Sequence, residues 1–153
     1  MGPAYGGMGG SIFNDHADRR LTSSDQCTGA VLHWSDDVLV FVRFLYSGNS
    51  NGTDYGSAAR HKYEKFQLRS NEQISTINLF IGEHRWAEDQ TNSTIIGIQF
   101  LTTFGRKTQV YGSSVGRMVT EPNRNGYTFG YATGRAGALV DRLQFVWYKF
   151  IFD

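Results

Sequence analysis

The sequence predicts an all-β fold, and three observations support this prediction. Glycine is abundant (18 residues), proline is scarce (2), and aromatic residues reach 14%. Apolar residues come in short runs rich in β-branched and aromatic side chains, and turn residues separate these runs at near-regular spacing. No segment has a helical period bounded by capping residues. This pattern is typical of a barrel, a sandwich or a prism.

Six segments have the composition and length of strands. In order, they are residues 38–46, 74–81, 95–103, 108–111, 127–131 and 143–152. Residues 74–81 alternate, with Ile77, Leu79 and Ile81 on one face and Ile74 among the residues of the other. Residues 57–66 are the best candidate for a helix, although they are polar and few.

The chain is long enough for a core and is expected to form one domain over residues 1–153. Fifteen Lys and Arg residues nearly balance fourteen Asp and Glu residues, which argues against a nucleic-acid partner. No apolar run has the length of a membrane span, so no membrane insertion is expected. Residues 1–4 do not have the features of a signal peptide, which leaves either a protein not exported by the usual route or a mature form.

Cys27 is the only cysteine of the sequence, and we expect a reduced, half-buried thiol. The alternative is a disulfide to a second subunit, which a lone cysteine in a secreted protein permits. Two glycosylation sequons begin at Asn51 and Asn92, and such triplets often arise by chance.

Motifs that could indicate catalysis or metal binding are better explained as ordinary loops. Residues 112–116 fit G-x-S-x-G, but that motif requires a strand followed by a helix, so we expect a polar loop. The four histidines have no zinc-ligand spacing. The carboxylate doublets 36–37 and 88–89 are expected in solvated turns. We therefore expect no enzyme activity, no metal and no cofactor.

A glycine-rich turn near the end of the sequence is the strongest candidate site. Gly134 and Gly137 free the backbone for a tight turn, and Asp141 follows four residues after Gly137. Backbone N–H donors beside a carboxylate can bind sugar hydroxyls, which both donate and accept hydrogen bonds. The alternative is that Asp141 only caps its own turn. A second glycine cluster, residues 6–10, could join this site if the fold brings the two ends of the chain together.

Tryptophan supplies a further candidate contact. Trp86 lies in a polar stretch between two predicted strands, where an exposed indole could stack on a sugar ring. It could equally cover the edge of a sheet. Trp34 and Trp147 are embedded in strand-like segments and are expected in the core.

The chain resembles the jacalin-related lectins over nearly its full length. The matching pieces are the opening at residues 5–15, the strand and E-x-I element at 66–68 and 72–74, the strand at 98–103, the glycine-rich piece at 129–137 and the G-x-x-x-D loop at 137–141. Each piece is common, but their order and spacing together are specific. The resemblance implies a β-prism I of three four-stranded Greek-key sheets with pseudo-threefold symmetry. It also implies that the N-terminal glycine loop lies beside the G-x-x-x-D loop.

The resemblance also implies roles for individual residues. Gly10 would approach the sugar with its backbone, Ala138 and Leu139 would donate backbone N–H bonds, and Asp141 would accept from two hydroxyls. Gly137 and Val140 complete this carbohydrate-binding loop. A third loop tunes specificity in the family, and its nearest counterpart here is residues 82–92, which contain Trp86.

Gly10 lies inside a continuous chain, which resembles the mannose- or glucose-preferring members of the family. The expected function is a non-catalytic lectin for mannose- or glucose-type glycans or glycoproteins. Weak single-site binding would favour a homodimer or higher oligomer. A secreted or extracellular location is favoured over a cytoplasmic one. The alternatives are a structural, self-assembling matrix module on the same fold and, less favoured, a glycosidase in which Asp15 or Asp18 joins Asp141.

Overall fold

The computed structural model describes residues 4–6, 11–14, 26–35, 38–47, 50–51, 55–56, 62–87, 90–121, 127–136 and 140–149. Within these ranges the chain forms strands and no helix, and it therefore contains no helix that could cross a membrane. All strand pairs are antiparallel, and they form three sheets.

The first sheet joins both ends of the sequence. Its order is β1-β13-β12-β2. The strands span Ala4–Gly6 (β1), Ser11–Asn14 (β2), Tyr127–Ala136 (β12) and Val140–Lys149 (β13). The N-terminal strands thus flank the C-terminal hairpin on both sides.

The second and third sheets come from the middle of the chain. The second sheet contains β3 (Cys27–Trp34), β4 (Leu39–Tyr46), β5 (Ser50–Asn51), β6 (Tyr55–Gly56) and β7 (Lys62–Gln67). β5 and β6 both pair with β4, so five strands occupy four rows. The third sheet, in the order β10-β9-β8-β11, contains β8 (Ile74–Ala87), β9 (Gln90–Thr102), β10 (Tyr111–Gly112) and β11 (Arg117–Glu121).

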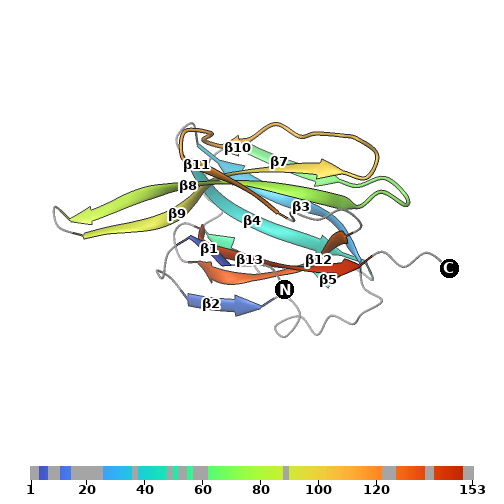
Figure 1. Cartoon of the computed structure of the whole chain (residues 1–153), viewed down its shortest axis with the longest axis horizontal. Helices are drawn as coiled ribbons and strands as arrows, with labels where there is room; N and C mark the ends of the chain where they lie inside the picture. The colour runs from blue at the N-terminus through green and yellow to red at the C-terminus, as the bar shows by residue number, and fades with distance from the viewer. Residues whose placement is uncertain are drawn as a thin grey trace.

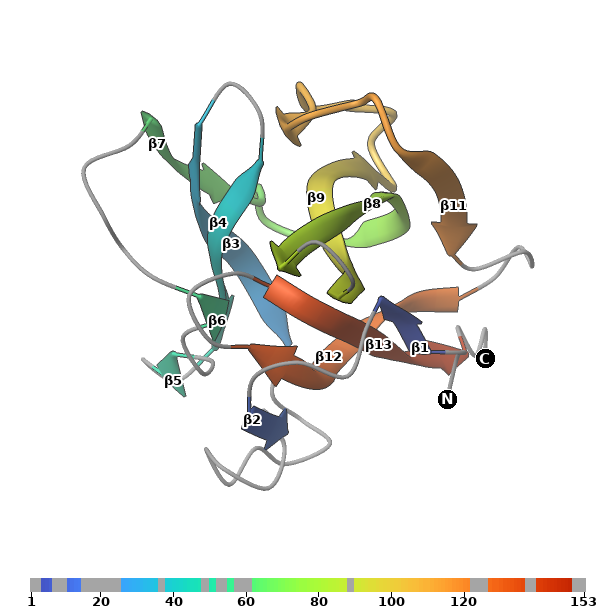
Figure 2. The same ribbon diagram turned by 90° about the vertical axis from the view of Figure 1, so that its left-hand side faces the viewer.

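The three sheets surround a common interior (Figure 2), and the main apolar core contains residues from all three. Phe44 of the second sheet, Phe100 of the third and Phe145 of the first are all fully buried. Their rings meet at centroid distances of 6.1 Å for Phe44–Phe100 and 6.5 Å for Phe44–Phe145. Because each sheet buries one face against the other two, none can form its core alone. The predicted all-β prism is confirmed.

The structure corrects the strand predictions at several places. The helix candidate at residues 57–66 is wrong over residues 62–66, because β7 (Lys62–Gln67) pairs with β3 along its length, and residues 57–61 lie outside the described ranges. The strands β1, β2, β5, β6 and β11 were not predicted from the sequence, and β3 was noted only as the strand-like segment that contains Trp34. The strand expected at residues 108–111 is confined to Tyr111–Gly112.

A register shift in β8 explains a second difference. Ile74 was assigned to the face opposite Ile77, yet both are buried in the core. The pairing of β8 with β9 shifts between Ile74 and Thr76, and this irregularity returns Ile74 to the inner face.

Cys27 and two tryptophans lie where buried residues were expected. Cys27 is 7% exposed, so this residue is more buried than predicted. Trp34 is buried, and Trp147 is partly buried against the core.

Gly112 shows why one glycine of the G-x-S-x-G motif is needed. Its φ is +104°, and a Cβ atom there would collide with the backbone of Ile96 and of Leu39. Glycine therefore permits β10 to pack against the start of β4. Residues 113–116 form the loop between β10 and β11, as predicted.

Candidate functional site

Strand register brings the two glycine-rich segments to the same end of the first sheet. β1 ends at Gly6, which pairs with Arg142, and β2 begins at Ser11, which pairs with Ala136. Ala136 also pairs with Val140 across the turn of the β12–β13 hairpin. The connection from β1 to β2 therefore starts on one side of this hairpin and ends on its other side. We call this part of the prism the loop end.

One buried hydrogen bond fixes the start of β13 at the loop end. Thr94 Oγ1 of β9 donates to the carbonyl oxygen of Val140 at 2.8 Å. Thr94 is 2% exposed and Val140 is fully buried. This hydrogen bond links the third sheet to the first directly after residues 137–139. It therefore fixes the position of Val140, the residue that follows that segment.

The described residues include only part of the predicted site. Gly10, Gly137, Ala138 and Leu139 lie outside them. Asp141 is in β13, and its backbone follows Val140 away from the turn, while its side chain lies outside the described part. The Val140 side chain belongs to the core, so any role of this residue in binding falls to its backbone.

Trp86 is in a strand, not in the loop that the sequence analysis expected. β8 continues to Ala87 and β9 begins at Gln90, so most of the expected loop at residues 82–92 forms a long two-stranded arm. This arm projects from the rest of the molecule at the left of Figure 1. Trp86 sits at a register shift between the pairs Arg85–Thr91 and Ala87–Gln90. Its side chain lies outside the described part.

Other sequence candidates are not assembled into a site by the described residues. Among these residues, no group of three or more His, Cys, Asp or Glu side chains could hold a metal ion. The carboxylate doublets at residues 36–37 and 88–89, and Asp15 and Asp18, lie outside the described ranges.

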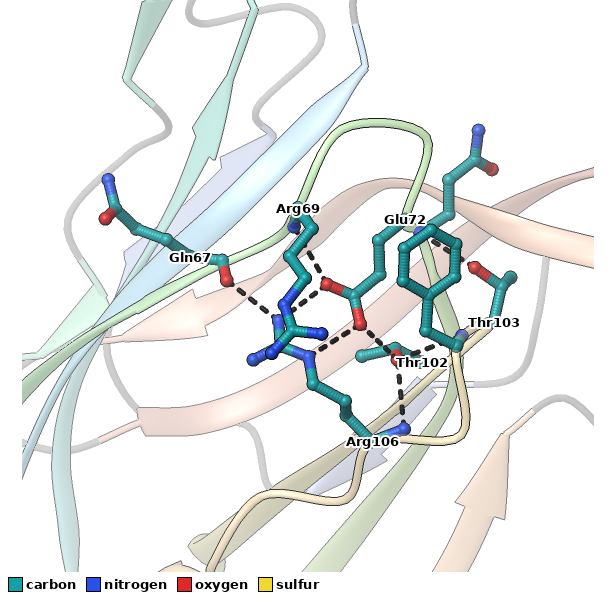
Figure 3. Close-up of polar contacts among 8 residues, drawn as sticks. Gln67, Arg69, Glu72, Thr102, Thr103 and Arg106 are labelled. Carbon is teal, nitrogen blue, oxygen red and sulfur yellow. Dashed lines mark hydrogen bonds and ion pairs between the residues drawn. The ribbon is translucent and has the colours of Figure 1, made fainter.

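The opposite end of the prism holds a buried ionic network (Figure 3). The Glu72 carboxylate accepts hydrogen bonds from Arg106 Nε at 2.7 Å and Arg106 Nη2 at 2.6 Å. It also accepts from Thr102 Oγ1 at 2.5 Å and from the Arg69 backbone N–H at 2.8 Å. The Glu72 side chain is fully buried, whereas that of Arg106 is 32% exposed. We call this region the Glu72 end.

These contacts keep Glu72 ionised. The hydrogen bonds from Arg106 outweigh the effect of burial and lower the pKa of Glu72 to about 2. Glu72 belongs to the E-x-I element noted in the sequence, but Arg106 lies 34 residues away from it. No local pattern could have shown that the two residues pair.

The two ends are far apart along β9. Thr94 marks the loop end and Thr102 marks the Glu72 end, a separation of eight residues. At about 3.3 Å per residue, this corresponds to roughly 26 Å. A residue that is substituted at one end therefore makes no direct contact with the other end.

Solved structures show the same architecture over nearly the whole chain. The artocarpin–mannopentose complex has a TM-score of 0.79 and 21% identity, covering 97% of this chain and 95% of that one. The mannose-binding lectin from Champedak has a TM-score of 0.78 and 21% identity, covering 95% and 94%. A mannose-binding jacalin-related lectin from Ananas comosus has a TM-score of 0.77 and 16% identity, covering 97% and 96%. No curated protein sequence matches the chain significantly.

The three sheets and their order define a β-prism protein. The sequence profile of the jacalin-like lectin domain matches residues 2–146. The chain therefore belongs to the jacalin-like lectin domain family, and the resemblance noted in the sequence is confirmed.

Proposed function

We propose that this protein is a non-catalytic lectin that binds mannose- or glucose-type glycans at the loop end. The observation that carries the proposal is the strand register, which anchors both glycine-rich segments beside Ala136. Membership of the jacalin-like lectin family supports carbohydrate binding. The similar structures described as mannose-binding or as mannose-oligosaccharide complexes favour mannose among the sugars.

In this proposal the backbone supplies most of the recognition. The N–H groups of Ala138 and Leu139 donate to the sugar, and the Asp141 carboxylate accepts from two adjacent hydroxyls. Gly10 and Gly137 allow the ring to approach the backbone closely, because neither has a side chain. The hydrogen bond from Thr94 fixes the position of Val140, where β13 begins after the loop. Trp86 on the arm contacts longer glycans beyond the first ring.

A site of this kind binds a single sugar weakly, since few of its contacts exclude water. A dimer or higher oligomer raises the apparent affinity for glycans with several branches without adding a contact at each sugar. Such a lectin would serve best in an extracellular location, where glycoproteins are displayed.

Titration calorimetry of the wild type and of Asp141→Ala tests the proposal. The ligands are mannose, glucose, galactose and a mannose oligosaccharide. We expect the wild type to bind mannose and its oligosaccharide, and Asp141→Ala to lose this binding while its melting temperature stays unchanged. Equal binding by both proteins would mean that the site is elsewhere. No heat with any sugar would favour the structural module instead.

A further inference from the structure

An open cleft lies where the second and third sheets meet. Its volume is about 550 Å³, which is within the usual range for small-molecule sites. β7 forms one wall, and the segment between β9 and β10 forms the other. The charged residues that line it are Glu64, Lys65, Arg106 and Lys107, and the neutral polar ones are Gln67, Thr108, Gln109 and Tyr111.

Two contacts cross the junction of the second and third sheets, which we call the seam, and hold the two walls of the cleft in place. At one side, Arg106 Nη2 donates to the carbonyl oxygen of Gln67 at 2.9 Å. At the other, the Tyr111 hydroxyl donates to the Glu64 carboxylate. Both contacts run from the third sheet side, where Arg106 follows β9 and Tyr111 is in β10, to β7 of the second sheet. A ligand would therefore find a preformed site and would lose little free energy in ordering it.

The floor of the cleft is also fixed, and it is not apolar. The Phe66 ring stacks on Phe100 in the core at a centroid distance of 5.6 Å. The guanidinium carbon of Arg106 lies 5.3 Å from the centroid of the Phe66 ring. Since the cation covers the aromatic ring, the cleft has no apolar shelf for a hydrophobic side chain. This argues against an apolar peptide as its ligand.

The charges of the lining leave a positive excess. Glu72 compensates Arg106 through two hydrogen bonds. Glu64 also lines the cleft, and its carboxylate offsets one of the two lysine charges, because the Tyr111 hydroxyl that donates to it is neutral. Among the described residues, no ion pair joins Lys65 or Lys107. Both lysines are exposed, and they belong to opposite walls of the cleft. Two lysines against one carboxylate leave a net positive charge in the lining, which attracts an anion.

The neutral side chains of the lining suit a ligand rich in hydroxyl groups. The amides of Gln67 and Gln109 each offer both donors and an acceptor. Both residues are exposed and line the cleft. Amides that can bind hydroxyls, placed between two cations, fit a sugar that bears negative charge.

We propose that this seam cleft is a second ligand site and that it binds an anionic saccharide. The anionic group is a sulfate or a uronic carboxylate, bound between Lys65 and Lys107, and the sugar hydroxyls contact Gln67 and Gln109. The cleft shares no residue with the loop end, so the inference stands independently of the proposed mannose site. Binding at this site weakens as ionic strength rises, because exposed charges carry much of it.

Calorimetric titration with a sulfated tetrasaccharide, its desulfated form and a uronic-acid tetrasaccharide tests the proposal. We expect saturable binding of one anionic ligand per chain and no binding of the desulfated form. The sulfated and uronic arms show which anion is preferred. Lys65→Glu and Lys107→Glu should each lower the affinity by about tenfold or more, because each loses a charge-assisted contact.

Lys62→Glu is the matched control, since Lys62 is exposed on the same strand but does not line the cleft. We expect it to bind as the wild type does, and Asp141→Ala should also retain this binding. Circular dichroism checks that each variant is folded. Equal losses in Lys62→Glu and Lys65→Glu would overturn the proposal, because diffuse surface charge would then explain the binding. The absence of saturable binding by either anionic tetrasaccharide would overturn it as well.

Discussion

The two ends of the prism are held by different kinds of contact. At the Glu72 end, one buried carboxylate collects hydrogen bonds from two side chains and one backbone group. At the loop end, backbone pairing positions the chain, and Thr94 supplies the side-chain hydrogen bond to Val140. The difference teaches that the buried ionic network lies apart from the end at which we propose that glycans bind. Substitutions should therefore affect stability and glycan binding separately.

Glu72→Gln is expected to have the largest effect on stability. The substitution leaves the partly buried Arg106 without its counter-ion, which costs about 3 kcal/mol. For a chain of this size, the melting temperature should fall by roughly 6–12 °C. Thermal unfolding followed by circular dichroism measures this change.

The affinity of Glu72→Gln for mannose, measured at 20 °C, tests whether the same substitution affects the loop end. We expect the affinity of the wild type, because the network lies roughly 26 Å along β9 from the Val140 contact. A parallel loss of binding would break the comparison, since it would show that the two ends are coupled.

Acid should weaken the Glu72 end selectively. The pKa of Glu72 is about 2 in the folded protein and 4.5 ordinarily, so its contribution is complete above pH 4.5 and disappears as the pH falls toward 2. Allowing for the partial exposure of Arg106, we expect a loss of about 2 kcal/mol over this range. Urea unfolding between pH 2 and pH 6 measures it. The difference between the wild type and Glu72→Gln should shrink as the pH falls, and a constant difference would contradict this assignment.

The sequence predicted the core better than it predicted the edges, and the reason is physical. Period-two patterns identified the central strands, because residues such as Ile77 and Leu79 alternate between core and surface. β7 was mistaken for a helix candidate, since in this edge strand only Phe66 is buried and no alternation is visible. β11 was missed in the same way, with a burial pattern that reaches the interior only at Glu121.

The candidate site divides along the same line. Family resemblance selected Gly10, Gly137 and Asp141, and strand register now supports bringing their segments together. The sequence could not predict that the Gly82 region continues as a strand, because its polar residues pair with each other in an arm. It also could not predict Arg106 as the partner of Glu72, since long-range ion pairs have no local signal.

Thr94→Val sharpens the comparison at the loop end. Valine has a similar shape but cannot donate, so the buried carbonyl of Val140 would lose its partner at a cost of about 1–2 kcal/mol. If about 1 kcal/mol of this free-energy cost disorders the start of β13 in the folded protein, the affinity for mannose falls about fivefold. Calorimetry and thermal unfolding measure the two effects. Thr102→Val is the matched control, which should lower stability and leave mannose binding unchanged.

Tyr111→Phe should have the smallest effect on stability among these substitutions. Tyr111 lies at the seam between the second and third sheets, between the two ends of the prism. Burial and the hydrogen bond to Glu64 raise the pKa of Tyr111, so the hydroxyl stays protonated and remains a donor. Glu64 is only half-buried, and water can replace the lost donor, so the expected cost is about 1 kcal/mol. Urea unfolding measures it, with Tyr63→Phe on the exposed face of β7 as a control that should change nothing. A loss as large as that of Glu72→Gln would show that the seam, and not only the Glu72 end, determines the stability of the prism.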